Sequence, residues 1–267
     1  MDLPCGQCVG CRLERSRQWA VRCMHEAQLH ESNLFLTLTY SDENLPPHGG
    51  LFYRDFQLFM KRLRKSQPSA RFYMCGEYGE QFKRPHYHAC LFGVDFLDKV
   101  PHGKSPSGEL LYRSPTLEKL WPLGHSSIGS VTFESAAYVA RYVMKKVTGS
   151  LAETAYKRVD PDTGEIHQVP PEFCRMSLKP GIGSKWLEKY QSDVYPADSV
   201  IVNGHHTRPP RYYDKQLKET NPQTFEHLTI GRYQRAISQS EDNTATRLET
   251  KKQVTLARLS LKKRNLE

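Results

Sequence analysis

Residues 84–93 read RPHYHACLFG, in which two histidines two positions apart precede an apolar run that ends at a glycine. In a β-strand, residues at positions i and i+2 point to the same face of the sheet. His86 and His88 would therefore present two imidazoles side by side, at a spacing that suits one metal ion. A chain with eleven histidines often contains such a pair by chance, so the neighbouring elements decide its meaning.

The segments around this strand predict an antiparallel sheet. Apolar residues and threonines alternate in NLFLTLTY at residues 33–40, as in a strand with one buried face. Residues 71–78, 86–94 and 127–133 are the other strand candidates. Residues 95–126 are rich in proline and glycine, so we expect them to be irregular apart from one short helix. The helices are expected at residues 12–30, 56–65, 116–121, 134–147 and 185–192.

The element order up to residue 149 is strand, helix, strand, strand, loop, strand, helix. This order predicts the α+β class, with an antiparallel sheet and helices on one of its faces. We expect a cysteine-rich helix before this core and an irregular extension after it, which ends in a solvent-facing helix or a disordered tail. The four regions are an N-terminal cysteine cluster and helix (1–32), the core (33–149), an accessory region (150–233) and a polar basic tail (234–267).

The 267 residues carry a formal net charge of +9. Such an excess of positive charge points to a polyanionic partner, most simply nucleic acid, although a membrane surface or an acidic protein would also attract it. No run approaches the eighteen apolar residues of a membrane span, and the N-terminus does not resemble a signal peptide. Seven cysteines without a secretion signal predict a reducing cytoplasm and no disulfide framework.

The first cysteines form a C-x2-C-x2-C cluster, CGQCVGC at residues 5–11. Thiolates at this spacing can hold structural zinc, so Cys5, Cys8 and Cys11 are candidate ligands. The alternative is a set of reduced thiols at the start of a helix. A fourth ligand would come from the following helix, from Cys23, His25 or His30.

A carboxylate lies within reach of the histidine pair if residues 71–78 and 86–94 form a hairpin. Glu77 would then approach an ion held by His86 and His88. Two imidazoles and one carboxylate leave coordination positions open for phosphate oxygens. Glu80 is an alternative third ligand.

The helix expected at residues 134–147 carries a second chemical pattern. Tyr138 and Tyr142 are four positions apart and share one helix face, and Lys145 and Lys146 follow one turn later. Ordinary packing would explain two tyrosines alone. Opposite a metal-binding strand, however, a tyrosine oxygen can attack phosphorus and form a phosphotyrosine. A lysine would hold the phosphate or favour the phenolate.

Three motifs occur in the order found in replication initiators of the HUH endonuclease superfamily, and the closest resemblance is to the initiators of gokushovirus-type microviruses, which are single-stranded DNA phages. The motifs are FLTLT at residues 35–39, PHYH at residues 85–88, and Tyr138-x3-Tyr142-x2-Lys145. Glu77 stands where related initiators carry the third metal ligand. The opening CGQCVGCR at residues 5–12 also resembles this phage group.

The resemblance implies a ferredoxin-like split βαβ fold and rolling-circle initiation in the host bacterial cytoplasm. A tyrosine would nick one strand of the origin with Mg²⁺ or Mn²⁺, form a 5′-phosphotyrosine and leave a 3′-OH for the host polymerase. The second tyrosine would close the strand after one round. Because the chain has no G-x4-G-K-[ST] motif, unwinding would fall to a host helicase.

Two alternatives remain. An HUH transposase or plasmid relaxase would share the chemistry, but such enzymes commonly differ in tyrosine number. A non-enzymatic, zinc-containing DNA-binding protein would make His86, His88 and Tyr142 incidental. Within the initiator interpretation, we expect Tyr142 to make the first cut, because Lys145 lies one turn beyond it, and Tyr138 to serve in strand transfer and closure.

Overall fold

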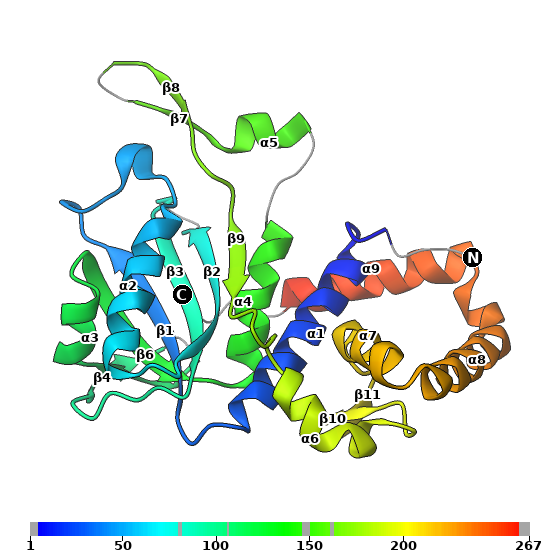
Figure 1. The fold of residues 1–267 in the computed structure, drawn as a ribbon. Helices are drawn as coiled ribbons and strands as arrows, with labels where there is room; N and C mark the ends of the chain where they lie inside the picture. Colours follow the sequence, from blue (N-terminus) through cyan, green and yellow to red (C-terminus); the bar gives the residue numbers. More distant parts are fainter. Residues whose placement is uncertain (1–4, 80–81, 106, 146–149, 161–162, 262–267) are drawn as a thin grey trace.

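The structure, a computed structural model, describes residues 5–79, 82–105, 107–145, 150–160 and 163–261, with residues 142–145, 150 and 151 described by their backbone alone. A seven-stranded antiparallel sheet in the order β4-β5-β6-β1-β3-β2-β9 forms its centre (Figure 1). Its inner strands lie close to the predicted positions. The strands are β1 (Asn33–Tyr40), β2 (Arg71–Tyr78), β3 (Pro85–Phe92), β4 (Val100–Lys104), β5 (Leu110–Arg113), β6 (Gly124–Ser130) and β9 (Phe173–Met176).

Strands β1 and β2 flank β3, and β3 is antiparallel to both. β1 and β2 therefore run parallel to each other, and the helix α2 (Tyr53–Ser66) connects them. This connection is a split βαβ unit, which was expected. The mixed α+β class and the antiparallel sheet are likewise confirmed.

Helices cover both faces of the sheet, so the prediction of helices on one face is wrong. Even-numbered residues of β1, such as Leu36, pack in one core with α2 and α3 (Pro115–Leu120). Phe35 faces the other way, into a core with α1 (Val9–Ala27) and α4 (Phe133–Lys145). The physical reason lies in β3, where Leu91 and Phe92 are both fully buried although they point to opposite faces. Each face thus carries apolar area that requires a covering layer.

The hairpin β4–β5 occupies part of the segment expected to be irregular, and that expectation is wrong here. All five residues of β4 are exposed, and its register shifts between Pro101 and Gly103. Proline, glycine and bulges are tolerated in edge strands, where one side of the ladder is unpaired. An exposed strand of this kind carries no alternating apolar pattern, which is why the sequence concealed it.

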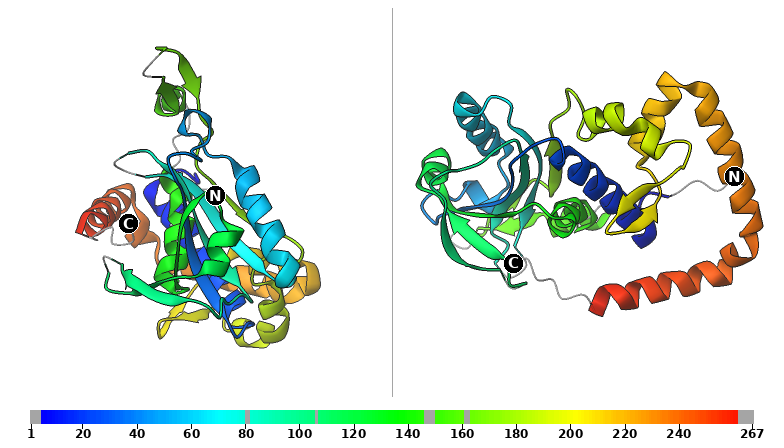
Figure 2. Two further views of the ribbon diagram at one scale, coloured as in Figure 1. Left: turned by 90° about the vertical axis from the view of Figure 1, so that its left-hand side faces the viewer. Right: turned by 90° about the horizontal axis from the view of Figure 1, so that it is seen from below.

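The C-terminal extension is mostly helical rather than irregular, which corrects a second expectation. Figure 2 shows that α8 and α9 reach away from the sheet. Neither helix buries a residue, in agreement with the expected solvent-facing tail. None of the helices in the described ranges is both long and apolar enough to cross a membrane. The elements beyond the core are α5 (Ser150–Ala155), β7 (Lys157–Val159), β8 (Ile166–Gln168), α6 (Ser184–Val194), β10 (Val200–Val202), β11 (His205–Thr207), α7 (Arg211–Thr220), α8 (Pro222–Ser238) and α9 (Ala245–Leu261), and two short 3₁₀ turns are η1 (Pro47–Gly49) and η2 (Ser240–Asn243).

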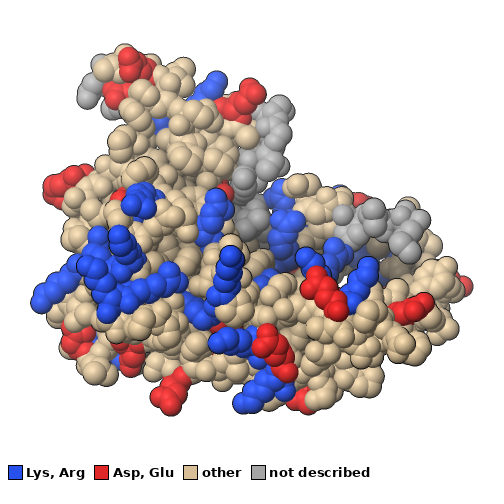
Figure 3. Space-filling view, viewed as in Figure 1, with Lys and Arg blue, Asp and Glu red and all other residues tan. Residues whose placement is uncertain are grey.

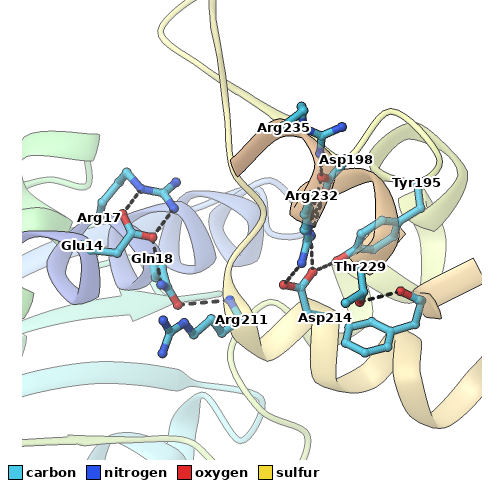
Figure 4. Close-up of polar contacts among 11 residues, drawn as sticks. Glu14, Arg17, Gln18, Tyr195, Asp198, Arg211, Asp214, Thr229, Arg232 and Arg235 are labelled. Atoms are coloured by element: carbon cyan, nitrogen blue, oxygen red, sulfur yellow. Dashed lines mark hydrogen bonds and ion pairs between the residues drawn. The ribbon is translucent and has the colours of Figure 1, made fainter. Parts of the chain in front are cut away.

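Polar contacts fix α8 to the preceding elements (Figure 4). The guanidinium of Arg232 lies between the carboxylates of Asp198 and Asp214, with 2.8 Å from its Nη1 to Asp214 Oδ2. On the other side of α7, the backbone N–H of Arg211 donates to Gln18 Oε1 at 3.0 Å. Because Gln18 belongs to α1, which packs on the sheet, the C-terminal helices are anchored to the core through α1.

Candidate metal centre

The register of three neighbouring strands brings the predicted ligands together. Glu77 on β2 lies directly across from His86 on β3, and His88 lies across from Thr37 on β1. Directly paired residues in an antiparallel sheet point to the same face. Glu77, His86 and His88 therefore share the sheet face on which α4 packs.

The geometry of this cluster is that of a preformed ligand set. Glu77 Oε1 lies 2.8 Å from Nε2 of His86 and 2.8 Å from Nε2 of His88. On the outer side of each ring, His88 Nδ1 lies 2.9 Å from Thr37 Oγ1 and His86 Nδ1 lies 3.0 Å from the carbonyl oxygen of Arg84. These contacts fix both imidazoles with Nε2 turned inward, as the outer partners of metal-binding histidines do.

The Glu77 side chain is fully buried. Burial, the largest effect, raises the pKa of its carboxyl, but the hydrogen bonds from His86 and His88 outweigh it and hold the pKa below its ordinary value. Its second oxygen, Oε2, is buried and accepts no hydrogen bond from the described residues. Leaving such an oxygen unsatisfied costs about 1–3 kcal/mol. A divalent cation between the three side chains would remove that cost, so the donor set fits an ion.

The alternative third ligand, Glu80, lies outside the described residues. Thr37 and the Arg84 carbonyl were not among the predicted site residues. The alternation in residues 33–40 contained a signal for Thr37, since it places the threonines on the face opposite the leucines. A backbone carbonyl leaves no such signal.

A groove of about 730 Å³ opens beside the histidines. Thr37, Thr39 and Gly129 form part of its floor, while Lys104 and Leu111 of the hairpin β4–β5 line one side. The groove thus exposes the ligand set to solutes. Phe82 and Arg84 line both this groove and a smaller pocket of about 440 Å³, so they stand where the two meet.

The helix α4 places Tyr138 at the ligand set. The ring of Tyr138 contacts the ring of His88 edge-on, and only 8% of the residue is exposed. α1 holds the helix here, since Ser16 Oγ donates to the carbonyl oxygen of Ala137 at 3.0 Å. Tyr142 and Lys145 follow on the same helix, but their side chains lie outside the described part of the chain, as does all of Lys146.

The comparisons with known proteins point to one family. A family model for replication-associated proteins of the ORF2 type matches residues 33–147, the span that contains the ligand set and the tyrosine pair. Replication-associated protein VP4 of Bdellovibrio phage phiMH2K is 37% identical over 232 residues, which cover 83% of this chain and 69% of the relative. The chain belongs to the family of replication-associated proteins of gokushovirus-type microviruses.

Two further relatives of this replication-associated protein support the assignment. Replication-associated protein ORF2 of Spiroplasma virus 4 is 32% identical over 233 residues, covering 81% of this chain and 68% of the relative. Replication-associated protein ORF4 of Chlamydia phage 1 is 29% identical over 228 residues, covering 81% and 54%. No solved structure matches the chain. The resemblance to this phage group is confirmed.

The N-terminal cysteines of this replication-associated protein form a compact cluster. One sulfur each from Cys5, Cys8 and Cys11 lies within 4.8 Å of the others. The backbone N–H of Cys8 donates to Cys5 Sγ at 3.3 Å, and that of Cys11 donates to Cys8 Sγ at 3.5 Å. The amide of Cys8, the largest effect, and that of Gln7 lower the pKa of Cys5 to about 7. The three thiols can therefore bind a soft ion such as zinc near neutral pH.

The expected fourth ligand is wrong for all three candidates. Cys23 is fully buried against Cys90, and burial raises the pKa of its thiol. His25 is buried with Nδ1 2.9 Å from the Tyr213 hydroxyl, and His30 pairs with Glu26 at 3.6 Å. The predicted helix had a signal for Cys23, which shares the i, i+3, i+7 row of Ala20 and Ala27 and therefore the face that packs on the sheet.

Basic residues gather over α2, on the sheet face opposite the groove. Figure 3 shows this concentration of positive side chains. The helix places Lys61, Arg64 and Lys65 in solvent. These residues form a second positive surface rather than a wall of the groove.

Proposed function

We propose that this protein is a rolling-circle replication initiator that nicks one strand at the viral origin with a tyrosine. The observation that carries the proposal is the convergence of Glu77, His86 and His88 on one sheet face, beside an open groove and below the helix that bears Tyr138 and Tyr142. Family membership supports a role in viral replication. The net charge of +9 supports single-stranded and origin DNA as the partner.

Glu77, His86 and His88 would hold Mg²⁺ or Mn²⁺. A bound divalent ion would polarise the scissile phosphate and offset its developing negative charge. Thr37 and the Arg84 carbonyl keep the two imidazoles oriented, so the ligand set needs little rearrangement when DNA enters. The groove holds the strand with its phosphate against the ligand set.

The tyrosines supply the nucleophiles. The phenolic oxygen of Tyr142 attacks phosphorus, the bond from phosphorus to the 3′-oxygen breaks, and that oxygen takes up a proton and becomes a free 3′-OH. The 5′-phosphate stays on the tyrosine, and Lys145 steadies it. After one round Tyr138 cuts the regenerated origin, and the new 3′-OH attacks the first phosphotyrosine, which closes the strand and frees Tyr142.

Host proteins complete the cycle in the bacterial cytoplasm. A host polymerase would extend the 3′-OH, and a host helicase would unwind the duplex. Inheritance of one covalent end from cut to closure requires no external energy, since each transfer exchanges one phosphodiester for another.

The experiment is a cleavage assay on single-stranded oligonucleotides tiled across the genome that encodes the chain, with Mg²⁺ or Mn²⁺. We expect one oligonucleotide to be cut and to yield a covalent protein–DNA band on a denaturing gel. Binding without cleavage on every oligonucleotide would instead support a non-enzymatic, zinc-containing DNA-binding protein. Cleavage at a transposon end or a plasmid transfer origin in preference to the phage origin would support a transposase or relaxase.

A further inference from the structure

A second cluster of metal-binding side chains lies outside the groove. His48 belongs to the turn η1, whereas Asp160 and His167 belong to the β7–β8 hairpin, far away in sequence. One ligand atom from each of the three lies within 4.8 Å of the others. We propose that His48, Asp160 and His167 form a Zn²⁺ site that ties the β7–β8 hairpin to the η1 turn.

The backbone on both sides presents these side chains to one another. His48 has a φ of 56°, in the left-handed region that non-glycine residues seldom adopt. The His48 and His167 rings stack, with 3.4 Å between their centroids. Asp160 Oδ1 accepts a hydrogen bond from the backbone N–H of Thr163 at 2.9 Å, which orients the carboxylate.

The donor atoms favour zinc over magnesium. Two imidazole nitrogens and one carboxylate oxygen are a common zinc set, whereas Mg²⁺ prefers oxygen ligands. Zinc binds these atoms at about 2.0–2.2 Å, so small side-chain rotations would bring the cluster to tetrahedral spacing. Glu165 Oε2 lies 3.5 Å from His167 Nε2 and offers a fourth ligand in place of water.

Neighbouring cations do not occupy the cluster. Arg84 and Arg158 line the same pocket, but each is engaged elsewhere. Arg84 Nη2 pairs with Asp42 at 2.7 Å, and Arg158 Nη1 donates to the carbonyl oxygen of Lys157 at 3.0 Å. His48 is exposed, so an ion can enter from solvent.

Zinc at this position would fix one side of the pocket that adjoins the groove. The β7–β8 hairpin stands away from the sheet (Figure 1) and forms its own two-stranded sheet. Its pocket shares Phe82 and Arg84 with the groove. The site would thus hold a projecting hairpin at the mouth of the groove, and it does not depend on the nicking reaction.

The test counts zinc in the full-length chain after chelation, reloading with Zn²⁺ under reducing conditions and removal of free metal. A background variant isolates the cluster by eliminating the other two sites. It carries Cys5→Ser, Cys8→Ser, Cys11→Ser, His86→Ala and His88→Ala. We expect one zinc per chain in this background and none after further addition of His48→Ala and His167→Ala. The matched control, His205→Ala with His206→Ala, should retain the zinc.

An empty background that folds normally, or a zinc count that survives His48→Ala and His167→Ala, would overturn the proposal. If circular dichroism shows that the background is unfolded, the unaltered chain serves instead. His48→Ala with His167→Ala should then lower its count by one zinc, and an unchanged count is contradictory. Zinc should also slow tryptic cleavage after Arg158 in the unaltered chain but not in the variant, and equal protection of both would refute the tie.

Discussion

The ring of Tyr138 stands edge-on against the ring of His88, with 5.1 Å between the ring centroids. This contact joins the helix that carries both tyrosines to the strand that carries both histidines. On its other side, His88 contacts Thr37, so the imidazole is held between β1 and α4. Tyr142 lies one turn beyond Tyr138 on the same helix face. The nucleophile and the ligand set are therefore positioned by one packed unit rather than by a loop.

Removal of the ligand set should abolish nicking. Replacing only the histidines would leave the Glu77 charge buried without its partners, which costs about 3–5 kcal/mol in comparable ion pairs. The triple variant Glu77→Gln, His86→Ala, His88→Ala avoids that charge. We expect it to fold, as judged by circular dichroism and thermal unfolding, and to lose divalent-dependent cleavage.

The paired exposed histidines of β11 provide the control for this variant. His205→Ala with His206→Ala removes two imidazoles outside the groove and should cleave normally. Undiminished cleavage by a folded triple variant would remove the metal hypothesis.

Phe82 should contribute to binding of single-stranded DNA. The residue is 87% exposed at the junction of the groove and the smaller pocket, where a base can stack on its ring. A stacked base contributes about 1–3 kcal/mol, so Phe82→Ala should weaken binding by roughly 5- to 150-fold. Fluorescence anisotropy with a labelled oligonucleotide measures the change. Tyr233→Ala, at a 60% exposed aromatic on α8, is the control, and equal affinities for both variants would argue against the stacking role.

The strands and the ligand set follow from local sequence patterns. Period-two alternation defined β1, and the hairpin from β2 to β3 is short enough for Glu77 to be placed beside His86 from spacing alone. The groove wall could not be predicted, because β4 is an exposed edge strand with Pro101 and Gly103. The contact of His48 with His167 depends on tertiary packing between distant segments, and neither histidine lies in a motif.

The cysteine cluster should bind one zinc per chain without help from Cys23. Cys8→Ser should lose this zinc, whereas Cys23→Ala should keep it, because the Cys23 thiol faces Cys90 in the core. Binding should strengthen as the pH rises through about 7, where the Cys5 thiol becomes a thiolate. Metal analysis of each variant under reducing conditions, in the His48→Ala, His167→Ala background, decides the matter. A Cys8→Ser protein with undiminished zinc would return the three residues to plain thiols.

Acid should destabilise the fold through His25. Burial lowers the pKa of His25 from 6.5 to about 4, so below pH 6.5 the unfolded chain binds a proton that the folded chain does not. Stability is therefore lost as the pH falls through this range, by about 2 kcal/mol between pH 7 and pH 5 for this residue. His25→Gln keeps a partner for the Tyr213 hydroxyl but does not titrate. Urea unfolding at both pH values should show a smaller loss for His25→Gln, and an identical loss would refute the assignment.

The central claim is tested most directly by locating the covalent bond. The chain is incubated with its cleaved oligonucleotide and Mn²⁺, digested with nuclease and trypsin, and the peptide that carries the nucleotide is sequenced by mass spectrometry. We expect the nucleotide on Tyr142 in the unaltered chain. Tyr142→Phe should severely reduce the adduct, and Tyr138→Phe should retain it but fail to release closed circles. An adduct that persists in the Tyr138→Phe, Tyr142→Phe double variant would contradict the tyrosine mechanism and require another nucleophile.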